Sequence, residues 1–396
     1  MKRELTDHWS LVTMLGLYIH IPFCEQRCPY CDFNTYAGVR AQLVEDYVDA
    51  LRRELVAQLT PLARAERVVD TIFFGGGTPT FLSAAQLEGI LQTVRESIAV
   101  RPNAEITLEA NPSTVANPEL SPAKLEHLRR AGFNRLSIGV QSFDDACLRT
   151  LGRAHSAVEA KETFRLARLA GYDNINIDLM FAVPGQTMGS WQQTLTEAMA
   201  LHPEHISAYC LTYEKATPFY RWRATGRLRP LSEDAEAEMF ERAMDALTDA
   251  GYEHYEISNF ARPGKRAQHN QIYWRGEEYV GAGAGAHGYL NGVRYWNEKL
   301  PQRYVARVSK EGRAIVGSER LSARARLGEA LMLGLRLLDG VSLDAMTERF
   351  QLDPRDVFER EMRRLTAFGL VRQENGRLWL TRQGVLLANR VFMEFV

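Results

Sequence analysis

The amino-acid sequence predicts an α/β protein built around a partial (β/α)6 barrel of the TIM type, followed by a smaller α+β module. Three observations support this fold class. Six short β-rich runs recur in the first half of the chain, amphipathic segments of helical length separate them, and the pattern changes after about residue 318. We expect an N-terminal extension over 1–14, the barrel domain over 15–300 and the C-terminal module over 301–396.

Strands and helices are expected to alternate along the barrel domain. The strands are predicted at 17–21, 69–74, 105–110, 135–139, 174–181 and 205–209. The helices between them are predicted at 43–59, 84–99, 122–131, 157–170 and 189–201. This alternation is typical of parallel strands joined by crossover helices, and its simplest arrangement is a closed or nearly closed barrel.

Composition limits the classes of protein to consider. A chain of 396 residues with 45% hydrophobic content can bury a large core, and its net charge of −1 gives no overall reason to expect nucleic acid or an anionic membrane as a partner. Five cysteines, an odd number, favour a reducing compartment over a disulfide scaffold. Since no apolar run reaches the ~20 residues that span a bilayer, we expect a cytoplasmic protein.

The residues best suited to chemistry follow the expected strands. Barrels of this type assemble their sites from the loops at the carboxyl ends of the strands, so these residues should converge on one face. They are Cys24, Cys28 and Cys31 after the first strand, Gly75, Gly76, Gly77 and Thr78 after the second, Glu109 at the end of the third, Gln141 after the fourth, and Asp178 on the fifth.

The spacing of Cys24, Cys28 and Cys31 suits a metal cluster. Three thiolates can bind three irons of a [4Fe-4S] cubane and leave the fourth iron open to an exogenous ligand. Spacing alone leaves two other interpretations open. One is a zinc site that His20 or another residue completes, and the other is a redox or disulfide role.

The remaining polar residues suit a small zwitterionic ligand. A glycine run lets backbone groups approach a ligand closely. Glu109 and Asp178 offer carboxylates for ribose hydroxyls or an amino group, and Gln141 and Arg153 could bind ribose, adenine or a carboxylate.

Together, the three cysteines, the triple glycine, Glu109 and Gln141 resemble the radical S-adenosylmethionine (SAM) superfamily. The resemblance implies that the methionine part of SAM chelates the open iron, and that the reduced cluster can cleave the sulfonium to a 5′-deoxyadenosyl radical. The runs at 18–24, 139–143 and 176–180 are similar to the branch that contains oxygen-independent coproporphyrinogen III oxidase.

That branch implies roles for individual residues. One SAM molecule should contact Tyr18, Gly76 and Glu109, with the backbone at Tyr30 against adenine. Other positions of this sequence match SAM contacts elsewhere in the branch, so both one and two SAM molecules stay open. They are Gly77, Thr78, Gln141, Arg153 and Asp178.

Phe33 favours a haem-chaperone branch over the oxidase itself. The oxidase has a fourth cysteine two residues after the third, where this chain has Phe33. The run at 269–274, His-Asn-Gln-Ile-Tyr-Trp, resembles the signature of HemW-type haem chaperones. This resemblance implies a protein without coproporphyrinogen oxidase activity that binds haem and passes it to acceptor haemoproteins. Respiratory, membrane-associated acceptors and a homodimer are candidate partners.

Haem binding suggests specific side chains. His269 is a candidate axial ligand, and Tyr273 and Trp274 are candidates to contact the porphyrin. A packed, hydrogen-bonded histidine beside two aromatic residues is the commoner situation. His20 and His287 are weaker candidates.

The glycine-rich run at 281–286 fits a loose dinucleotide-binding pattern. It opens no βαβ unit and has no acidic residue about twenty positions later, so close packing at the edge of the barrel explains it better.

The last part of the chain resembles a winged-helix module. Helices are predicted at 323–338, 342–350 and 354–368, and a hairpin at 370–374 and 377–381 turns at Asn375-Gly376. Arg355, Arg360, Arg363 and Arg364 offer positive charge, which Glu359 and Glu361 dilute. We therefore expect this module to cover the barrel opening or to dock a partner, and no nucleic acid to bind.

Three functions compete, in this order: a haem chaperone with a radical SAM site, a coproporphyrinogen III oxidase, and a zinc-stabilised nucleic-acid-binding protein. The first predicts haem binding without porphyrinogen turnover. The second predicts loss of propionate carboxylates as CO2, and the third predicts zinc and salt-dependent affinity for nucleic acid.

Overall fold

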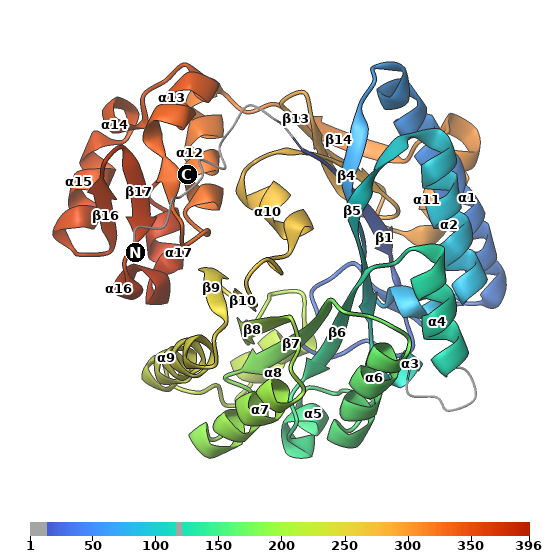
Figure 1. Ribbon diagram of the computed structural model, residues 1–396, viewed down its shortest axis with the longest axis horizontal. Helices are drawn as coiled ribbons and strands as arrows, with labels where there is room; N and C mark the ends of the chain where they lie inside the picture. The colour runs from blue at the N-terminus through green and yellow to red at the C-terminus, as the bar shows by residue number, and fades with distance from the viewer. Residues whose placement is uncertain (1–13, 116–120) are drawn as a thin grey trace.

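The computed structural model describes residues 14–115 and 121–396, so the expected N-terminal extension over 1–14 lies almost wholly outside the described residues. A large module holds a twelve-stranded sheet, and a smaller C-terminal module lies beside its open side (Figure 1). None of the described helices is long and apolar enough to cross a membrane.

The six expected strands of the barrel are all present and run parallel to one another. They are β1 (Leu15–Ile21), β4 (Val68–Gly76), β5 (Ala99–Ala110), β6 (Arg135–Gln141), β7 (Ile175–Phe181) and β8 (His205–Cys210). The expected helices cover the outer face of this curved sheet in Figure 1. They are α1 (Ala41–Arg64), α2 (Ala84–Ser97), α4 (Ser121–Ala131), α6 (Ala157–Leu169) and α7 (Met188–Ala200).

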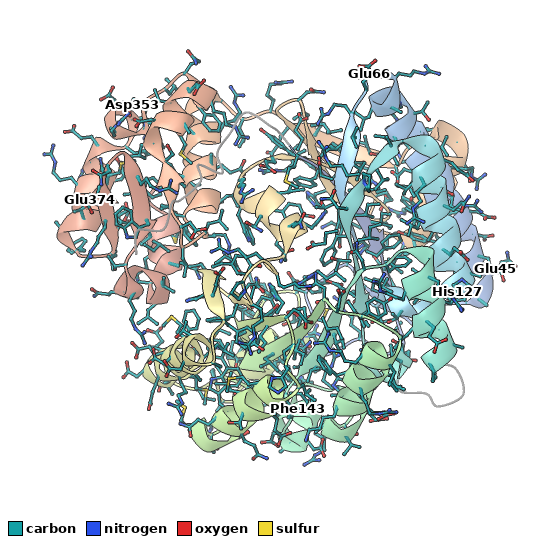
Figure 2. All side chains as sticks on the ribbon, viewed as in Figure 1. Glu45, Glu66, His127, Phe143, Asp353 and Glu374 are labelled. Carbon is teal, nitrogen blue, oxygen red and sulfur yellow. The ribbon has the colours of Figure 1, made fainter. Side chains whose placement is uncertain are left out.

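The helices begin where their sequences favour it. Ser83 and Ser156 cap α2 and α6, and each forms a reciprocal capping box with Gln86 and Glu159 respectively. The strands carry the apolar residues that these helices cover, and β1 is buried along almost its whole length. Figure 2 shows side chains filling the space that the curved sheet encloses.

The sheet stays open, which confirms a partial barrel. Its strand order is β14-β13-β12-β11-β1-β4-β5-β6-β7-β8-β10-β9, so β14 and β9 are edges. The strands added to the barrel are β11 (Glu278–Ala282), β12 (His287–Leu290), β13 (Val293–Asn297) and β14 (Ile315–Glu319) on one side, and β10 (Asn259–Ala261) and β9 (Glu253–Glu256) on the other. Strand β11 pairs with β1 in parallel, and the others pair antiparallel.

Close packing accounts for the glycine-rich run at 281–286. A Cβ atom on Gly281 would lie 1.8 Å from the carbonyl oxygen of His287, and one on Gly283 would lie 2.5 Å from that of His20. The run forms the end of β11 and the turn into β12, not the start of a helix, so the dinucleotide interpretation is wrong.

Further elements complete the large module. They are β2 (Phe23–Cys24), β3 (Tyr36–Ala37), the 3-10 helix η1 (Pro79–Phe81), α3 (Pro112–Val115), α5 (Asp145–Thr150), α8 (Pro218–Ala224), α9 (Glu233–Asp249), α10 (Gln268–Trp274) and α11 (Pro301–Glu311). The expected boundary at residue 300 falls inside the large module, because α11 packs on α1 and β14 continues the sheet. The elements of the smaller module begin at α12.

The C-terminal module has the expected helices and hairpin. It consists of α12 (Ala323–Gly334), β15 (Val341–Ser342), α13 (Leu343–Phe350), α14 (Pro354–Val357), α15 (Glu359–Ala367), β16 (Val371–Glu374), β17 (Arg377–Leu380), α16 (Arg382–Leu386) and α17 (Ala388–Phe392). The helix predicted at 354–368 is broken at Phe358, whose side chain turns inward and packs edge-on against Phe395. Arg355, Arg363 and Arg364 pair with nearby carboxylates, which neutralises much of the positive charge noted in the sequence.

Candidate functional site

The three cysteines lie in the loop that follows β1, at the carboxyl ends of the strands. A turn from the Cys28 carbonyl to the Cys31 amide, 3.1 Å apart, shapes the loop. Cys24, Cys28 and Cys31 are all half-buried, form no disulfide, and line one cavity of about 140 Å³. The prediction that strand ends bring the polar residues together is therefore confirmed for this cavity. It is lined by Tyr30, Gly76, Gly77, Thr78, Glu109, Gln141, Arg153 and Asp178 as well.

The donor set around the cavity fits a cluster better than a single ion. Among the described residues, no three His, Cys, Asp or Glu side chains come close enough to hold one metal ion. In a cubane each cysteine binds a different iron, so the sulfurs are spread around the cube. The Thr78 hydroxyl donates to Cys24 Sγ at 3.5 Å, and Arg153 donates to Cys28 Sγ at 3.6 Å. Both donors would stabilise thiolate charge.

Burial makes two of the thiols, those of Cys24 and Cys31, harder to deprotonate when no metal binds them. Burial raises the pKa of Cys24 to about 11 and also raises the pKa of Cys31. Because iron binds the thiolate form, cluster assembly must release these protons.

His20 cannot complete a zinc site as placed here. Its Nδ1 atom shares a hydrogen bond of 2.9 Å with the Tyr18 hydroxyl, and its Nε2 atom shares one of 2.9 Å with the Asn34 carbonyl oxygen. Burial lowers the pKa of His20 to about 4, which keeps the ring neutral. His20 therefore positions the cluster loop by its bond to Asn34 and does not serve as a ligand.

The glycines after β4 let its backbone lie directly against the cluster loop. Gly76 has φ of 115°, and a Cβ atom there would lie 2.4–2.9 Å from the His20 ring atoms. A Cβ atom on Gly77 would lie 3.0 Å from Cys24 Sγ. The Gly77 amide also donates to the Ile21 carbonyl at 2.8 Å, which fixes the end of β4 to the end of β1.

Two carboxyl groups face the same cavity. Glu109 accepts a hydrogen bond from the Gly76 amide at 3.1 Å, yet burial and the nearby Asp178 raise its pKa to about 8. Asp178 accepts from Ser137 and Asn176 at 3.1 and 2.8 Å, and burial raises its pKa too. Such a pair favours a ligand with positive charge, because the cation would allow both groups to ionise.

The wall opposite the glycines carries a strained residue and a cation. Gln141 has φ of 68°, a left-handed conformation that is rare for a residue other than glycine and typical of functional sites. Arg153 donates to the Gly139 carbonyl at 2.8 Å and to the Tyr30 hydroxyl at 3.5 Å. Of the residues predicted to contact SAM, Tyr18 does not line this cavity. It lines a neighbouring one of about 560 Å³, together with Phe33 and His287.

Sequence reasoning missed Arg135. This side chain is only 2% exposed, lies at the start of β6, and interacts electrostatically with Glu109 and Asp178. A signal was present: side chains alternate along a strand, so Arg135 and Ser137 share a face with Gln141 if the strand stays regular. The strand is not regular, because its register with β7 shifts between Ile138 and Gln141, so alternation alone does not place the Arg135 side chain.

His269 lies at the opposite end of the barrel and is not available to haem iron. Helix α10 places it against the start of β1 and β4, where it is fully buried. Its Nδ1 atom hydrogen-bonds the Thr71 hydroxyl and its Nε2 atom the Tyr273 hydroxyl, both at 2.8 Å. Since both ring nitrogens are engaged and burial lowers its pKa to about 3, His269 is a structural histidine. Tyr273 and Trp274, by contrast, line a separate cavity at the C-terminal end of α10.

Comparisons with known proteins agree with this architecture. The model of the radical SAM superfamily matches residues 18–198, and that of the HemN C-terminal domain matches residues 321–387. The chain is 38% identical to heme chaperone HemW from Bacillus subtilis, over 97% of this chain and 99% of that protein. It is 43% identical to HemW from Escherichia coli, over 69% and 70% of the two chains.

Two further relatives extend these similarities. The mitochondrial radical S-adenosyl methionine domain-containing protein 1 of Mus musculus is 36% identical over 91% of this chain and 83% of that protein. Among solved structures, coproporphyrinogen III oxidase HemN from Escherichia coli, a radical SAM enzyme, superposes with a TM-score of 0.82. It is 26% identical and covers 97% of this chain and 90% of its own.

Proposed function

The chain belongs to the HemW family of the radical SAM superfamily, and from this membership we propose that it binds haem and delivers it to acceptor haemoproteins. The observation that carries the proposal is the similarity to a heme chaperone over 97% of this chain and 99% of the relative, which includes the cluster loop and the C-terminal module. Respiratory, membrane-associated haemoproteins are the acceptors we favour, and a homodimer is the assembly we favour.

Cys24, Cys28 and Cys31 would hold a [4Fe-4S] cluster. Their thiols open on one cavity, and two neighbouring hydrogen-bond donors, Thr78 and Arg153, compensate thiolate charge. This cluster would supply an open iron to which an amino acid can chelate and an electron for a bound SAM.

The wall of the same cavity would hold SAM. The backbone at Gly76 and Gly77 would let SAM approach closely, because neither residue has a Cβ atom. The carboxyl of Glu109 lines the same cavity and would pair with the ammonium group of SAM. Gln141, Asp178 and Arg153 offer hydrogen-bonding groups on the opposite wall, and Tyr30 borders it. Tyr18 would contact SAM only from the neighbouring cavity, which also has room for a second molecule.

Phe33 supports a chaperone over the oxidase. The side chain is 68% exposed and lines both the cluster cavity and the neighbouring one. It occupies the position where the oxidase has a cysteine, so the thiol of that enzyme has no counterpart at this point of the chain.

The test is anaerobic reconstitution of the full chain with iron and sulfide, followed by haem titration and a coproporphyrinogen III assay with SAM and a reductant. We expect saturable haem binding and no protoporphyrinogen IX. Robust formation of protoporphyrinogen IX would instead establish the oxidase, and failure to bind haem in any state of the cluster would contradict the chaperone function.

We predict that SAM affinity of the reconstituted protein rises with pH between 6 and 8. Glu109, with a pKa of about 8, is largely protonated at pH 6, and only its carboxylate attracts the cationic groups of SAM. As pH rises toward this pKa, the proton that binding must displace becomes easier to lose. The limiting slope is about tenfold in the dissociation constant per pH unit.

Isothermal titration in two buffers of different ionisation enthalpy would measure both the affinity and the proton released. The matched variant Glu109→Gln should bind SAM more weakly and lose this pH dependence. An unchanged pH dependence of SAM affinity in Glu109→Gln would show that Glu109 does not bind SAM.

A further inference from the structure

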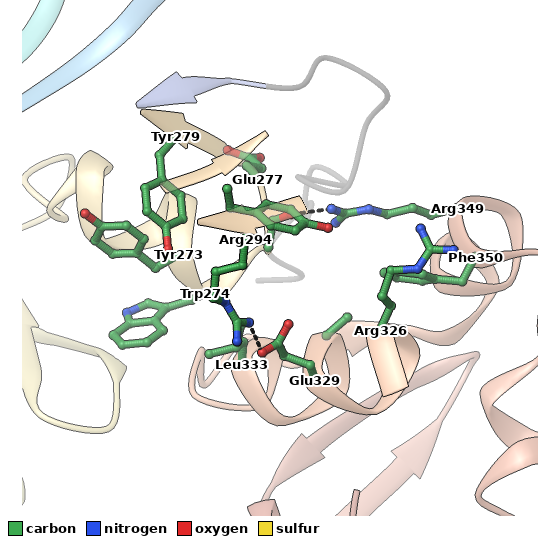
Figure 3. Close-up of a pocket in the computed structure, with 13 residues that line it drawn as sticks. Tyr273, Trp274, Glu277, Tyr279, Arg294, Arg326, Glu329, Leu333, Arg349 and Phe350 are labelled. Carbon is green, nitrogen blue, oxygen red and sulfur yellow. Dashed lines mark hydrogen bonds and ion pairs between the residues drawn. The ribbon is translucent and has the colours of Figure 1, made fainter. Parts of the chain in front are cut away.

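A third cavity lies between the two modules, away from the cluster. It measures about 330 Å³, and Figure 3 shows its walls. One wall comes from the end of α10 and from β11 to β13, and the other comes from α12 and α13 of the C-terminal module. Its volume is at the lower end of the range of small-molecule sites, so a larger ligand would keep one edge exposed.

The walls are rich in aromatic rings. Tyr273 and Tyr279 meet edge to face, with ring centroids 4.7 Å apart, and Trp274, Tyr289 and Phe350 complete the surface. Aromatic walls favour a flat, apolar ligand, because rings stack against it and bury its area. No histidine lines this cavity among the described residues, so tyrosine oxygens are the iron-ligating atoms that the walls offer.

Several polar groups at this cavity lack a partner. The Trp274 indole nitrogen, Glu277 Oε2 and Arg326 Nε are buried, and none makes a hydrogen bond within the described part of the chain. Buried polar groups are nearly always paired in folded proteins. Unpaired groups around one cavity therefore point to a ligand that pairs with at least some of them.

Two guanidinium groups at the cavity, those of Arg326 and Arg349, form no ion pair within the described residues, although Glu277 and Glu278 act electrostatically on Arg349. Arg294 pairs with Glu319 and Glu329, and so is neutralised. Arg349 donates only to the backbone carbonyls of Arg275, at 2.7 Å, and Gly276. Neither Arg326 nor Arg349 forms an ion pair with any carboxylate of the described residues, although both line the cavity. Arginine is well suited to bind carboxylates at such a site.

We propose that haem binds in this cavity between the modules, with its macrocycle against the aromatic walls and its two propionates on Arg326 and Arg349. The inference rests on the proposed chaperone function and adds to it the place of binding. Haem has the required chemistry, namely a flat apolar ring, two carboxylates on one edge and an iron that tyrosine can bind. The exposed edge of such a haem is what an acceptor would take.

The neighbouring cavity of about 560 Å³ is the competing site. Two histidines line it. Both ring nitrogens of His20 are engaged by hydrogen bonds, whereas His287 is exposed and stacks on Trp296 with ring centroids 6.1 Å apart. Lys299 adds a positive charge. It borders the cluster loop through Phe33 and Asn34, however, and so belongs with the radical SAM site. Tyr273 and Tyr279 line both cavities and separate one from the other.

The test is haem titration of the reconstituted full chain and of three variants. Arg326→Ala/Arg349→Ala should weaken haem binding by roughly tenfold or more, since two charge-assisted contacts are lost. The matched control Arg363→Ala removes an exposed arginine of the same module and should bind haem as the wild type does. His287→Ala, which probes the competing site, should also bind haem normally.

Leu333→Trp provides a second route, because it fills the cavity without removing charge and should block haem while iron and sulfide content stay unchanged. Wild-type affinity in both the double arginine variant and Leu333→Trp, or loss of binding in His287→Ala, would overturn this location. If the wild-type chain itself fails to bind haem, the proposed function fails instead.

Discussion

Replacing Cys24, Cys28 and Cys31 together by alanine is expected to abolish incorporation of iron and sulfide. The only thiols that line the cluster cavity are these three, and no neighbouring His or carboxylate forms a metal-binding group with them within the described residues. Iron and sulfide per chain, with the visible absorbance of the reconstituted protein, would measure the loss. We further expect slower haem transfer to an acceptor, because we propose that cluster occupancy orders the surface that docks the acceptor or a second subunit.

The matched control is Cys147→Ala/Cys210→Ala. Cys147 is buried in a small apolar cluster with Leu151 and Val183, and Cys210 ends β8, so neither lines the cluster cavity. This control should keep full iron and sulfide content. Haem transfer at the wild-type rate in the triple variant would show that the cluster does not control delivery, while cluster formation in that variant would refute the ligand assignment.

Glu54→Ala is expected to give the largest loss of stability, roughly 3–5 kcal/mol in the free energy of unfolding. Glu54 of α1 is completely buried and accepts hydrogen bonds from the Gly283 amide, the Asn297 side chain and the Tyr304 hydroxyl, at 2.8, 2.8 and 2.7 Å. These donors lie on or beside β11, β13 and α11. Alanine would leave the Gly283 amide and the Tyr304 hydroxyl buried without this acceptor, while the Asn297 side chain would keep only its bond to the Gly283 carbonyl at 3.0 Å.

Urea unfolding followed by far-ultraviolet circular dichroism would measure this change. Glu54→Gln keeps one oxygen acceptor and should lose less than Glu54→Ala. Glu45→Ala, at an exposed position of the same helix, should change stability little (Figure 2). A loss below about 1 kcal/mol for Glu54→Ala would mean that water replaces the carboxylate as acceptor.

The barrel and its cluster cavity could be predicted from the sequence because both depend on local patterns. Alternating strands and helices fixed the parallel order, and parallel strands bring their carboxyl ends to one face. Strand order alone therefore predicts that Glu109, Gln141 and Asp178 lie near the cysteines, as they do in the cluster cavity.

What could not be predicted depends on contacts between distant segments. His269 resembles a ligand in the sequence, but α10 places it at the end of the barrel opposite the cluster. There, the hydroxyls of Thr71 and Tyr273 hydrogen-bond both of its ring nitrogens. The pairing of β11 with β1 and of β14 with β13 likewise extends the large module past the expected boundary. The break at Phe358 follows from burial of its ring, which outweighs the helical propensity of the segment around it.

The cavity of Figure 3 is bounded by two modules that each have their own sheet, so its width follows the angle between those modules. A rotation of the C-terminal module about the segment at 320–322 would widen the cavity, but it would have to open the β-bridge between Glu256 and Leu337 that joins the two modules. With such a hinge, one orientation of the two modules would retain a ligand in the cavity and another would release it. An acceptor that binds both modules at once would then control the angle between them, and with it the width of the cavity.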